Sequence, residues 1–491
     1  MGILSLLLCT PALGVAVLAF LPGPRHRLVK PIAHCTVFLT LVLSIWLLLQ
    51  FDQANEALQF SEYFALNPAL GSAYALGVDG ISLPMLVLAT LLTMIALLAS
   101  GSIDTSVKGY YICVLLLEFG MLGVFLAQDW ALFYIFWEVT LIPLYFLIDR
   151  WGGARRHAAS LNFVLYTMGG SIFMLVSLLA LSHYNFETGG SLMANMHVAA
   201  QGMPRHEQVL VLLGFLIGFG VKMPIFPLHG WLPLAHVEAP SPISILLSGI
   251  LLKMGAYGLI RVVVMLPEAT QLLQPVLMTL ALFGMLYGAL LAWRQTDLKA
   301  MVAYASVSHM SMVLLGLVTL NVTGISGAIL QMTAHGLIAA ALFLLVGLLY
   351  ERTHTRNVRD YASLVRVMPR FALLMTFTLL AAMGLPGSVS FIAELHIVIG
   401  GFQRWGAVMV VFSLTILVSA AYAMRTISHL FTGPVLPRMQ YIADLNKREL
   451  LAAGVLVGLI VLFGLLPAAL IDLSAATIGQ LNSDIAARLA L

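Results

Sequence analysis

The sequence predicts an all-α polytopic membrane protein with about fourteen transmembrane helices. Of its 491 residues, 61% are hydrophobic and 9% are charged, and the mean hydropathy is +1.01. An ordinary soluble domain is about 25% charged, so this composition excludes that class. Apolar runs of about 20 residues are long enough to cross a bilayer. The net charge of +3 is small, and it gives no indication of a nucleic-acid partner.

Fourteen apolar segments follow one another with short connections. The first lacks a charged n-region and a small-residue cleavage site, so we expect a retained helix and not a cleaved signal. No linker is long enough to separate domains, and residues 1–491 are expected to form one bundle. The expected spans are 3–21, 31–51, 80–100, 111–127, 130–148, 160–183, 208–226, 240–265, 272–293, 300–319, 323–350, 370–399, 405–430 and 449–470.

The distribution of Lys and Arg predicts the orientation. With these spans, 18 of the 24 basic residues fall in loops on one side, 3 on the other, and 3 inside spans. Basic loops stay in the cytoplasm, so both termini are expected on the opposite, outer side. The acidic segment 51–79 lies on that outer side, and its simplest interpretation is a solvated loop.

Two spans are interrupted by helix breakers. The seventh carries Pro224 and Pro227 just after Lys222, and the twelfth carries Gly384-Leu385-Pro386-Gly387 in mid-span. The two spans are five helices apart and therefore run in opposite directions. Broken helices in corresponding positions indicate inverted repeats with an ion site at the breaks. A simple proline kink is the alternative for either one.

Ionisable residues inside the spans point to proton transfer. Such groups are costly in a bilayer and survive only when they are paired, hydrated or used. From the fifth span to the twelfth they follow the order Glu138, Lys222, Lys253, His309, His335 and Glu394. Burial shifts the pKa of a carboxyl or an amine toward neutrality, as a stepwise proton carrier requires.

Each residue also has a structural explanation. Lys222 and Glu138 could form a static ion pair, Lys253 and Glu394 could extend toward the membrane surface, and a single histidine can be a packing residue. Glu118 in the fourth span has no obvious neighbour. The ordered series favours the relay over these explanations taken separately.

Four motifs resemble the antiporter-like subunits of respiratory complex I, and among these the M-type subunits. They are FWEVTLIPLYFLI (136–148), KMPIFPLHGWLPLAHVEAPSPIS (222–244), GILLKMGAYGLIR (249–261) and QTDLKAMVAYASVSHM (295–310). The resemblance extends from LGVDGIS (76–82) to beyond LPGSVSFIAE (385–394). Sister L-type and N-type subunits usually carry lysine in the twelfth helix, where this chain has Glu394.

The resemblance implies a fold and a set of site residues. It implies two inverted five-helix repeats, helices 4–8 (111–265) and 9–13 (272–430), between three N-terminal helices (1–110) and a C-terminal helix (449–491). It implies that Glu138 pairs with Lys222, that Lys253 connects the halves, and that Glu394 ends the exit path. His309 and His335 match the central axis, and His229 and His236 match the HxWLPxAH histidines.

The implied function is proton translocation in a bacterial inner membrane, with both termini periplasmic. Flavin, iron–sulfur clusters and quinone are expected on partner subunits. We expect no cofactor in this chain, because Cys9, Cys35 and Cys113 are isolated and an iron–sulfur cluster needs about four thiolates. The expected partners are the neighbouring L-type and N-type subunits and the lipid bilayer. Leu234 stands where the family usually has aspartate, which removes a carboxylate expected in a cytoplasmic loop.

Other functions remain open at this point. The same module occurs in membrane-bound hydrogenases and inorganic-carbon uptake complexes, and copurifying subunits would distinguish these. A stand-alone cation/proton antiporter is disfavoured by Glu394 and by the lack of an acidic cluster in the spans. A scaffold that carries no protons is disfavoured by the ordered ionisable series.

Overall fold

The computed structural model describes residues 2–22, 27–67, 71–184 and 190–489, and it is almost entirely helical. Each of the fourteen predicted spans coincides with one helix or with successive helices. Among the described residues, ten helical stretches are long and apolar enough to cross a membrane, and Ile3–Ala19, Ser82–Leu98 and Pro369–Ala382 are shorter apolar helices. The helices that build the bundle are α1 (Ile3–Ala19), α2 (Val29–Gln50), α3 (Ser82–Leu98), α4 (Val107–Leu126), α5 (Trp130–Val139), α6 (Leu141–Trp151), α7 (Arg156–His183), α9 (Arg205–Lys222), α10 (Trp231–Glu238), α11 (Ser241–Leu246), α12 (Leu252–Met265), α13 (Pro267–Arg294), α14 (Leu298–Val318), α15 (Val322–Thr353), α17 (Pro369–Ala382), α18 (Val389–Trp405), α19 (Val410–Phe431) and α20 (Lys447–Leu465).

Short polar residues fix where several helices begin. The side chain of Asp129 accepts from Leu132 N at the start of α5, and Asn321 accepts from Gly324 N at the start of α15. Asn446 and Glu449 form a reciprocal capping box on α20. Each cap satisfies amide groups that the first helical turn leaves without intrahelical partners.

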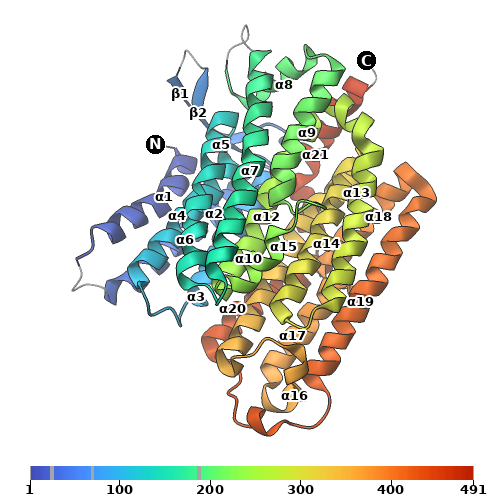
Figure 1. Ribbon diagram of the computed structural model, residues 1–491. Helices are drawn as coiled ribbons and strands as arrows, with labels where there is room; N and C mark the ends of the chain where they lie inside the picture. Colours follow the sequence, from blue (N-terminus) through green and yellow to red (C-terminus); the bar gives the residue numbers. More distant parts are fainter. Residues whose placement is uncertain (1, 23–26, 68–70, 185–189, 490–491) are drawn as a thin grey trace.

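Several predicted spans are divided. The predicted helix 130–148 is interrupted at Thr140, and 370–399 is split into α17 and α18. The predicted 208–226 ends at Lys222, after which the chain resumes as α10. The two breaks lie in helices of opposite direction, since α9 descends from the end that carries α8 (Met193–Gln201) and α17 rises from the end that carries α16 (Leu364–Val367) (Figure 1). This is the inverted-repeat arrangement.

The two ends of the bundle differ (Figure 1). One end, here called the hairpin face, carries β1 (Gln59–Asn67), β2 (Ser72–Val78), α8 and a last helix, α21 (Ala468–Leu489). The opposite end, here called the loop face, carries α16 and the short 3-10 turns Val358–Asp360 and Pro437–Met439. The start of α1 also lies at the hairpin face, because Leu4 N donates to Glu62 Oε1 of β1 at 2.8 Å.

The interpretation of 51–79 as a solvated loop was wrong for most of its length. Residues 59–67 and 72–78 form an antiparallel pair of strands with two register irregularities. Asp79 is 4% exposed and forms an ion pair with Arg261. Of the four acidic residues in 51–79, Asp52 and Glu56 are exposed. The polar sequence of this segment concealed the hairpin, because the outward face of the hairpin lacks the regular alternation that marks a strand.

The C-terminal region contains two helices where one was expected. Pro467 separates α20 from α21, which lies across the hairpin face. Gly80 N donates to Thr477 Oγ1 at 3.1 Å, and an Arg488 guanidinium nitrogen donates to Met265 O at 3.2 Å. A Cβ on Gly80 would lie 2.3 Å from Leu473 O, so only glycine allows α21 to approach this closely.

Candidate functional site

The first break leaves Lys222 at the end of α9 with its side chain buried. Its residue is 1% exposed, and its Nζ donates to Thr140 Oγ1 at 2.9 Å. The ammonium also lies 4.0 Å from the centroid of the Trp137 ring, a cation–π distance. Trp231 Nε1 donates to Val221 O at 2.8 Å and so satisfies a carbonyl that the break would otherwise leave free.

The expected Glu138–Lys222 ion pair was wrong as a direct contact. The charge of Glu138 acts on Lys222, but no ion pair within 4 Å joins them in the described part of the chain. Glu138 instead lines a lateral groove of about 620 Å³, with Tyr134, Ile142 and Met168 among its walls. Its Oε1 is buried without a hydrogen-bond partner. The interruption at Thr140 places the hydroxyl, and not the carboxylate, next to the lysine.

Lys253 lies at the centre of the bundle and is fully buried. A π-turn at Leu247–Leu251 precedes it, and such wide turns are frequent at functional sites. Its Nζ donates to Ser248 O at 2.6 Å and lies 2.6 Å from His335 Nδ1. An ammonium has only donors, so His335 accepts through Nδ1 when the lysine is charged. The possibility that Lys253 extends to the membrane surface is therefore contradicted.

The histidine pair continues this line on α14 and α15. The rings of His309 and His335 are 5.5 Å apart between centroids. Gln331 Nε2 lies 3.2 Å from His309 Nδ1, and Ser248 and Ser306 share a hydrogen bond of 3.1 Å. Each of these groups is able to donate or accept, as a hydrogen-bonded proton path requires.

The second break places Glu394 near the far side of the histidines. Glu394 is 5% exposed, and the backbone at Gly384 and Gly387 is left-handed, with φ of +82° and +91°. A space of about 10 Å³, close to the volume that one water needs, lies between the histidines and Tyr422 of α19. Tyr422 is 2% exposed and lines this space together with His309 and His335. The space thus places a hydroxyl next to the two histidines.

The two remaining predicted histidines are less closely connected. His236 is fully buried and stacks on Phe343 at 4.6 Å, and neither ring nitrogen has a hydrogen-bond partner. His229 is 7% exposed and packs against Phe226 and Tyr287. In the described part of the chain the ammonium groups of Lys222 and Lys253 bond to other partners, Thr140 for the first and Ser248 and His335 for the second. The charge of Lys253 nevertheless acts on His236.

Glu118 has a neighbour that the sequence did not indicate. Thr40 Oγ1 of α2 donates to Glu118 Oε1 at 2.7 Å, and Glu118 is fully buried. It lies among the N-terminal helices, away from the residues that line the central path.

Comparison with known proteins assigns the family. A model described as "NADH:quinone oxidoreductase/Mrp antiporter, TM" matches residues 127–419, which cover both breaks and the predicted site residues from Glu138 to Glu394. This chain belongs to that family. It is an antiporter-like, proton-pumping membrane subunit of an NADH:quinone oxidoreductase.

The similar proteins agree on which subunit of complex I this is. The chain is 41% identical over 449 residues to NADH-ubiquinone oxidoreductase chain 4 of Arabidopsis thaliana, covering 91% of this chain and 90% of the relative. It is 39% identical over 472 residues to NAD(P)H-quinone oxidoreductase chain 4 1 of a Picosynechococcus species, covering 93% and 87%. Chain 4 is the M-type subunit, so the resemblance found in the motifs is confirmed.

Solved structures support the same fold. A chain of respiratory complex I from Thermus thermophilus superposes with a TM-score of 0.87 at 29% identity, covering 97% of this chain and 99% of that one. A chain of the Mrp complex from a Dietzia species gives a TM-score of 0.86 at 20% identity, covering 98% of each chain. The latter likeness shows the fold alone.

The departure at Leu234 lies on a helix and not in a loop. Leu234 is part of α10 and half-buried, so the expected loop position was wrong. One helical turn later, Glu238 approaches Arg155, with Nε to Oε1 at 3.4 Å. Lys299 Nζ donates to the adjacent Ala239 O at 2.8 Å. A carboxylate is thus present on α10 of this antiporter-like subunit, four residues after Leu234.

Several residues of the path were missed in the sequence. Thr140, Trp137, Ser248 and Tyr422 are common residue types in membrane helices, and only their contacts distinguish them. Thr140 and Lys222 are 82 residues apart, a separation that no local pattern reports. The one available signal was position, since Trp137 and Thr140 flank Glu138 in the FWEVT motif.

Proposed function

We propose that this subunit moves protons along a path formed by Glu138, Lys222, Lys253, the His309–His335 pair and Glu394. The observation that carries the proposal is the 2.6 Å approach of Lys253 Nζ to His335 Nδ1 at mid-bundle. Two buried side chains that can both carry a proton and that touch one another are what a relay needs in a medium without free water.

The resting state holds a proton on Lys222. Thr140 and Trp137 stabilise the ammonium by a hydrogen bond and a cation–π contact. A change of charge at Glu138 alters the electrostatic energy of that ammonium, because the two charges interact through a low dielectric. The proton then passes to Lys253, then to His309 and His335, and then past the Tyr422 hydroxyl to Glu394.

The distribution of basic residues supports a proposed setting for the subunit. We place it in a bacterial inner membrane with the basic loop face in the cytoplasm and the hairpin face periplasmic. The groove beside Glu138 gives a neighbouring L-type or N-type subunit access to that carboxylate. The flavin, iron–sulfur clusters and quinone belong to partner subunits, and the redox energy reaches this chain through its neighbours.

The experiment is pumping by single-residue variants in the assembled complex. NADH-driven proton uptake is measured in inverted membrane vesicles, with assembly checked by native electrophoresis. Lys222→Ala and Glu138→Ala are expected to abolish coupled uptake and to depress quinone reduction. Lys447→Ala is the control, since that lysine is exposed at the start of α20. Near-normal uptake in either test variant, with the complex assembled, would overturn the proposal.

A further inference from the structure

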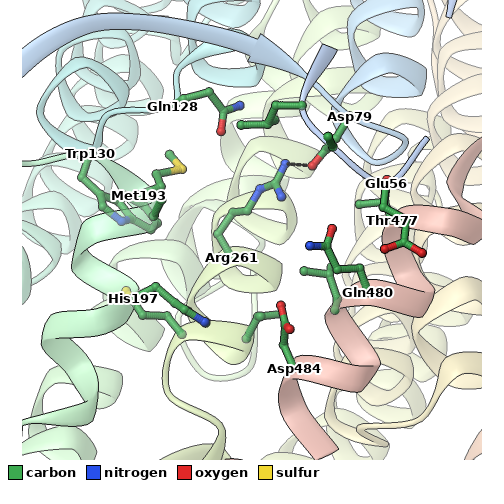
Figure 2. Close-up of a pocket in the computed structure, with 16 residues that line it drawn as sticks. Glu56, Asp79, Gln128, Trp130, Met193, His197, Arg261, Thr477, Gln480 and Asp484 are labelled. Atoms are coloured by element: carbon green, nitrogen blue, oxygen red, sulfur yellow. Dashed lines mark hydrogen bonds and ion pairs between the residues drawn. The ribbon is translucent and has the colours of Figure 1, made fainter. Parts of the chain in front are cut away.

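A second polar space lies at the hairpin face, apart from the relay. It has a volume of about 360 Å³, enough for roughly ten waters at the density of the liquid. Figure 2 shows its walls, with His197 from α8 on one side, Arg261 of α12 and Asp79 behind, and Gln480 and Asp484 of α21 opposite. Six separate parts of the chain thus meet around one cavity.

The buried Asp79–Arg261 ion pair forms one wall of this cavity. An Arg261 guanidinium nitrogen lies 2.6 Å from Asp79 Oδ2, and the two side chains are 14% and 5% exposed. Asp79 Oδ1 also accepts from the Ile81 and Ser82 amides. Burial by itself would raise the pKa of Asp79, but Arg261 and these amides hold the pKa below its ordinary value, so the carboxylate is charged at rest.

The ion pair is linked to the relay by one face of α12. Lys253, Tyr257 and Arg261 are spaced four residues apart, which places them along the same side of the helix. The same Arg261 nitrogen donates to Tyr257 Oη at 2.9 Å. Tyr257 is fully buried one helical turn after Lys253, and its hydroxyl contacts Arg261.

The charges on the cavity wall favour a cation over an anion. Glu56, Asp79 and Asp484 line it together with Arg261 and His197, so the carboxylates outnumber the guanidinium. Within the described residues, no group of three or more His, Cys, Asp or Glu side chains is placed to hold a metal ion. The wall therefore favours a mobile cation over an anion, and the proton is the cation that the proposed relay carries.

We propose that this cavity is an aqueous vestibule and that Asp79 is a second proton outlet, which connects Lys253 to the hairpin face. The inference rests on the proposed function, because it takes its proton from the same relay. It adds an outlet in parallel with Glu394.

The proton balance is simple. The Lys253 ammonium gives up a proton in the direction of the Tyr257 hydroxyl, which accepts one proton and passes its own to the Asp79 carboxylate. The neutral carboxyl no longer holds Arg261, and the ion pair opens. Asp79 then releases the proton into the vestibule, and the ion pair forms again. Thr477 of α21 keeps the Asp79 turn in place by accepting from Gly80 N.

A parallel outlet is tested in an enzyme whose first outlet is closed. NADH-driven proton uptake per assembled complex is compared for Glu394→Gln and for Glu394→Gln combined with Asp79→Asn and Arg261→Gln. Removing both charges of the pair leaves no unpaired buried charge. We expect Glu394→Gln to retain uptake and the combined variant to lose at least nine-tenths of it. Equal uptake in the two enzymes would overturn the second outlet. A combined variant that assembles poorly but pumps normally per complex would also overturn it, because the ion pair would then have only a structural role.

A second variant covers failure of the combined enzyme to assemble. Tyr257→Phe keeps the ion pair and removes only the linking hydroxyl. In the Glu394→Gln enzyme it is expected to reduce uptake at least fivefold, and unchanged uptake would refute the path through α12. The proposed function has its own test, since uptake that survives Lys222→Ala refutes the relay as a whole, whereas loss there with no effect at Asp79 or Tyr257 refutes the second outlet alone.

Discussion

Replacing Thr140 with valine removes the hydroxyl that accepts from the Lys222 ammonium and keeps nearly the same shape. The hydrogen bond is 2.9 Å long and lies in a fully buried site. A hydrogen bond to a charged group contributes about 1.5–3 kcal/mol. Because about 1.4 kcal/mol corresponds to a factor of ten, the charged form of Lys222 should lose roughly tenfold to a hundredfold in population relative to the neutral form.

The assay is the pH dependence of NADH-driven proton uptake in membrane vesicles. A lysine that holds its proton less well requires a higher proton concentration to reload, so the Thr140→Val profile should move to lower pH by about one to two units. Thr140→Ser is the matched control, because it keeps the hydroxyl and loses only a methyl group. The methyl group packs near Gly120, so a small loss of stability in the control is expected.

One result would refute this reasoning directly. If Thr140→Val and Thr140→Ser give the same profile as the unmodified enzyme, the hydroxyl does not govern the charge of Lys222. The cation–π contact with Trp137 would then be the main support of the ammonium, and the break in the fifth helix would have no role in proton loading.

Two further predictions concern the second break and the hairpin face. Gly384 and Gly387 both have left-handed backbone, so alanine at either should cost about 1–2 kcal/mol in thermal stability. Only at Gly384 would the new Cβ come within 2.5 Å of the Glu394 carboxylate, so Gly384→Ala alone should also depress proton uptake. Equal uptake in the two variants would contradict this. Partial burial and the nearby Arg488 lower the pKa of His197 to about 4, so the folded state stays neutral where the unfolded chain takes up a proton. The free energy of unfolding of α8 should therefore fall by about 1–2 kcal/mol as the pH falls from about 6.5 to 4, a value discounted for the partial exposure of His197. Hydrogen exchange over 193–201 measures this change. A pH response that persists in His197→Gln would assign it to another group.

Hydropathy and helix breakers predicted most of the fold. A membrane span is indicated locally by a long apolar run, and the broken helices are indicated by Pro224 and Gly384 with their neighbours. The hairpin and α21 were missed for a shared reason, since their residues are more polar than a span and depend on contacts with the rest of the chain. Asp79 is the clearest case, because its partner Arg261 is 182 residues away.

The site was predicted as a set of residues and not as a set of contacts. Lys253, His309 and His335 do come together, because each is an ionisable group on a helix of the core. The direct ion pair expected between Lys222 and Glu138 is not formed, since Thr140 Oγ1 contacts the lysine and Glu138 lines the lateral groove. No pattern in one sequence reports where a helix is interrupted when the residue at that position is an ordinary threonine.

The π-turn before Lys253 has a consequence for how the helix tolerates change in length. It accommodates one more residue per turn than an α-helix, and Lys253 Nζ bonds to the Ser248 carbonyl, five residues earlier. Deleting Gly249 would allow this turn to close as ordinary α-helix, with Lys253 and the residues after it kept in the same phase relative to 241–246. Deleting one residue from the α-helical segment after the turn would instead rotate everything that follows by about 100°. The π-turn is thus the place where the eighth helix can lose a residue without turning its later side chains away from their partners.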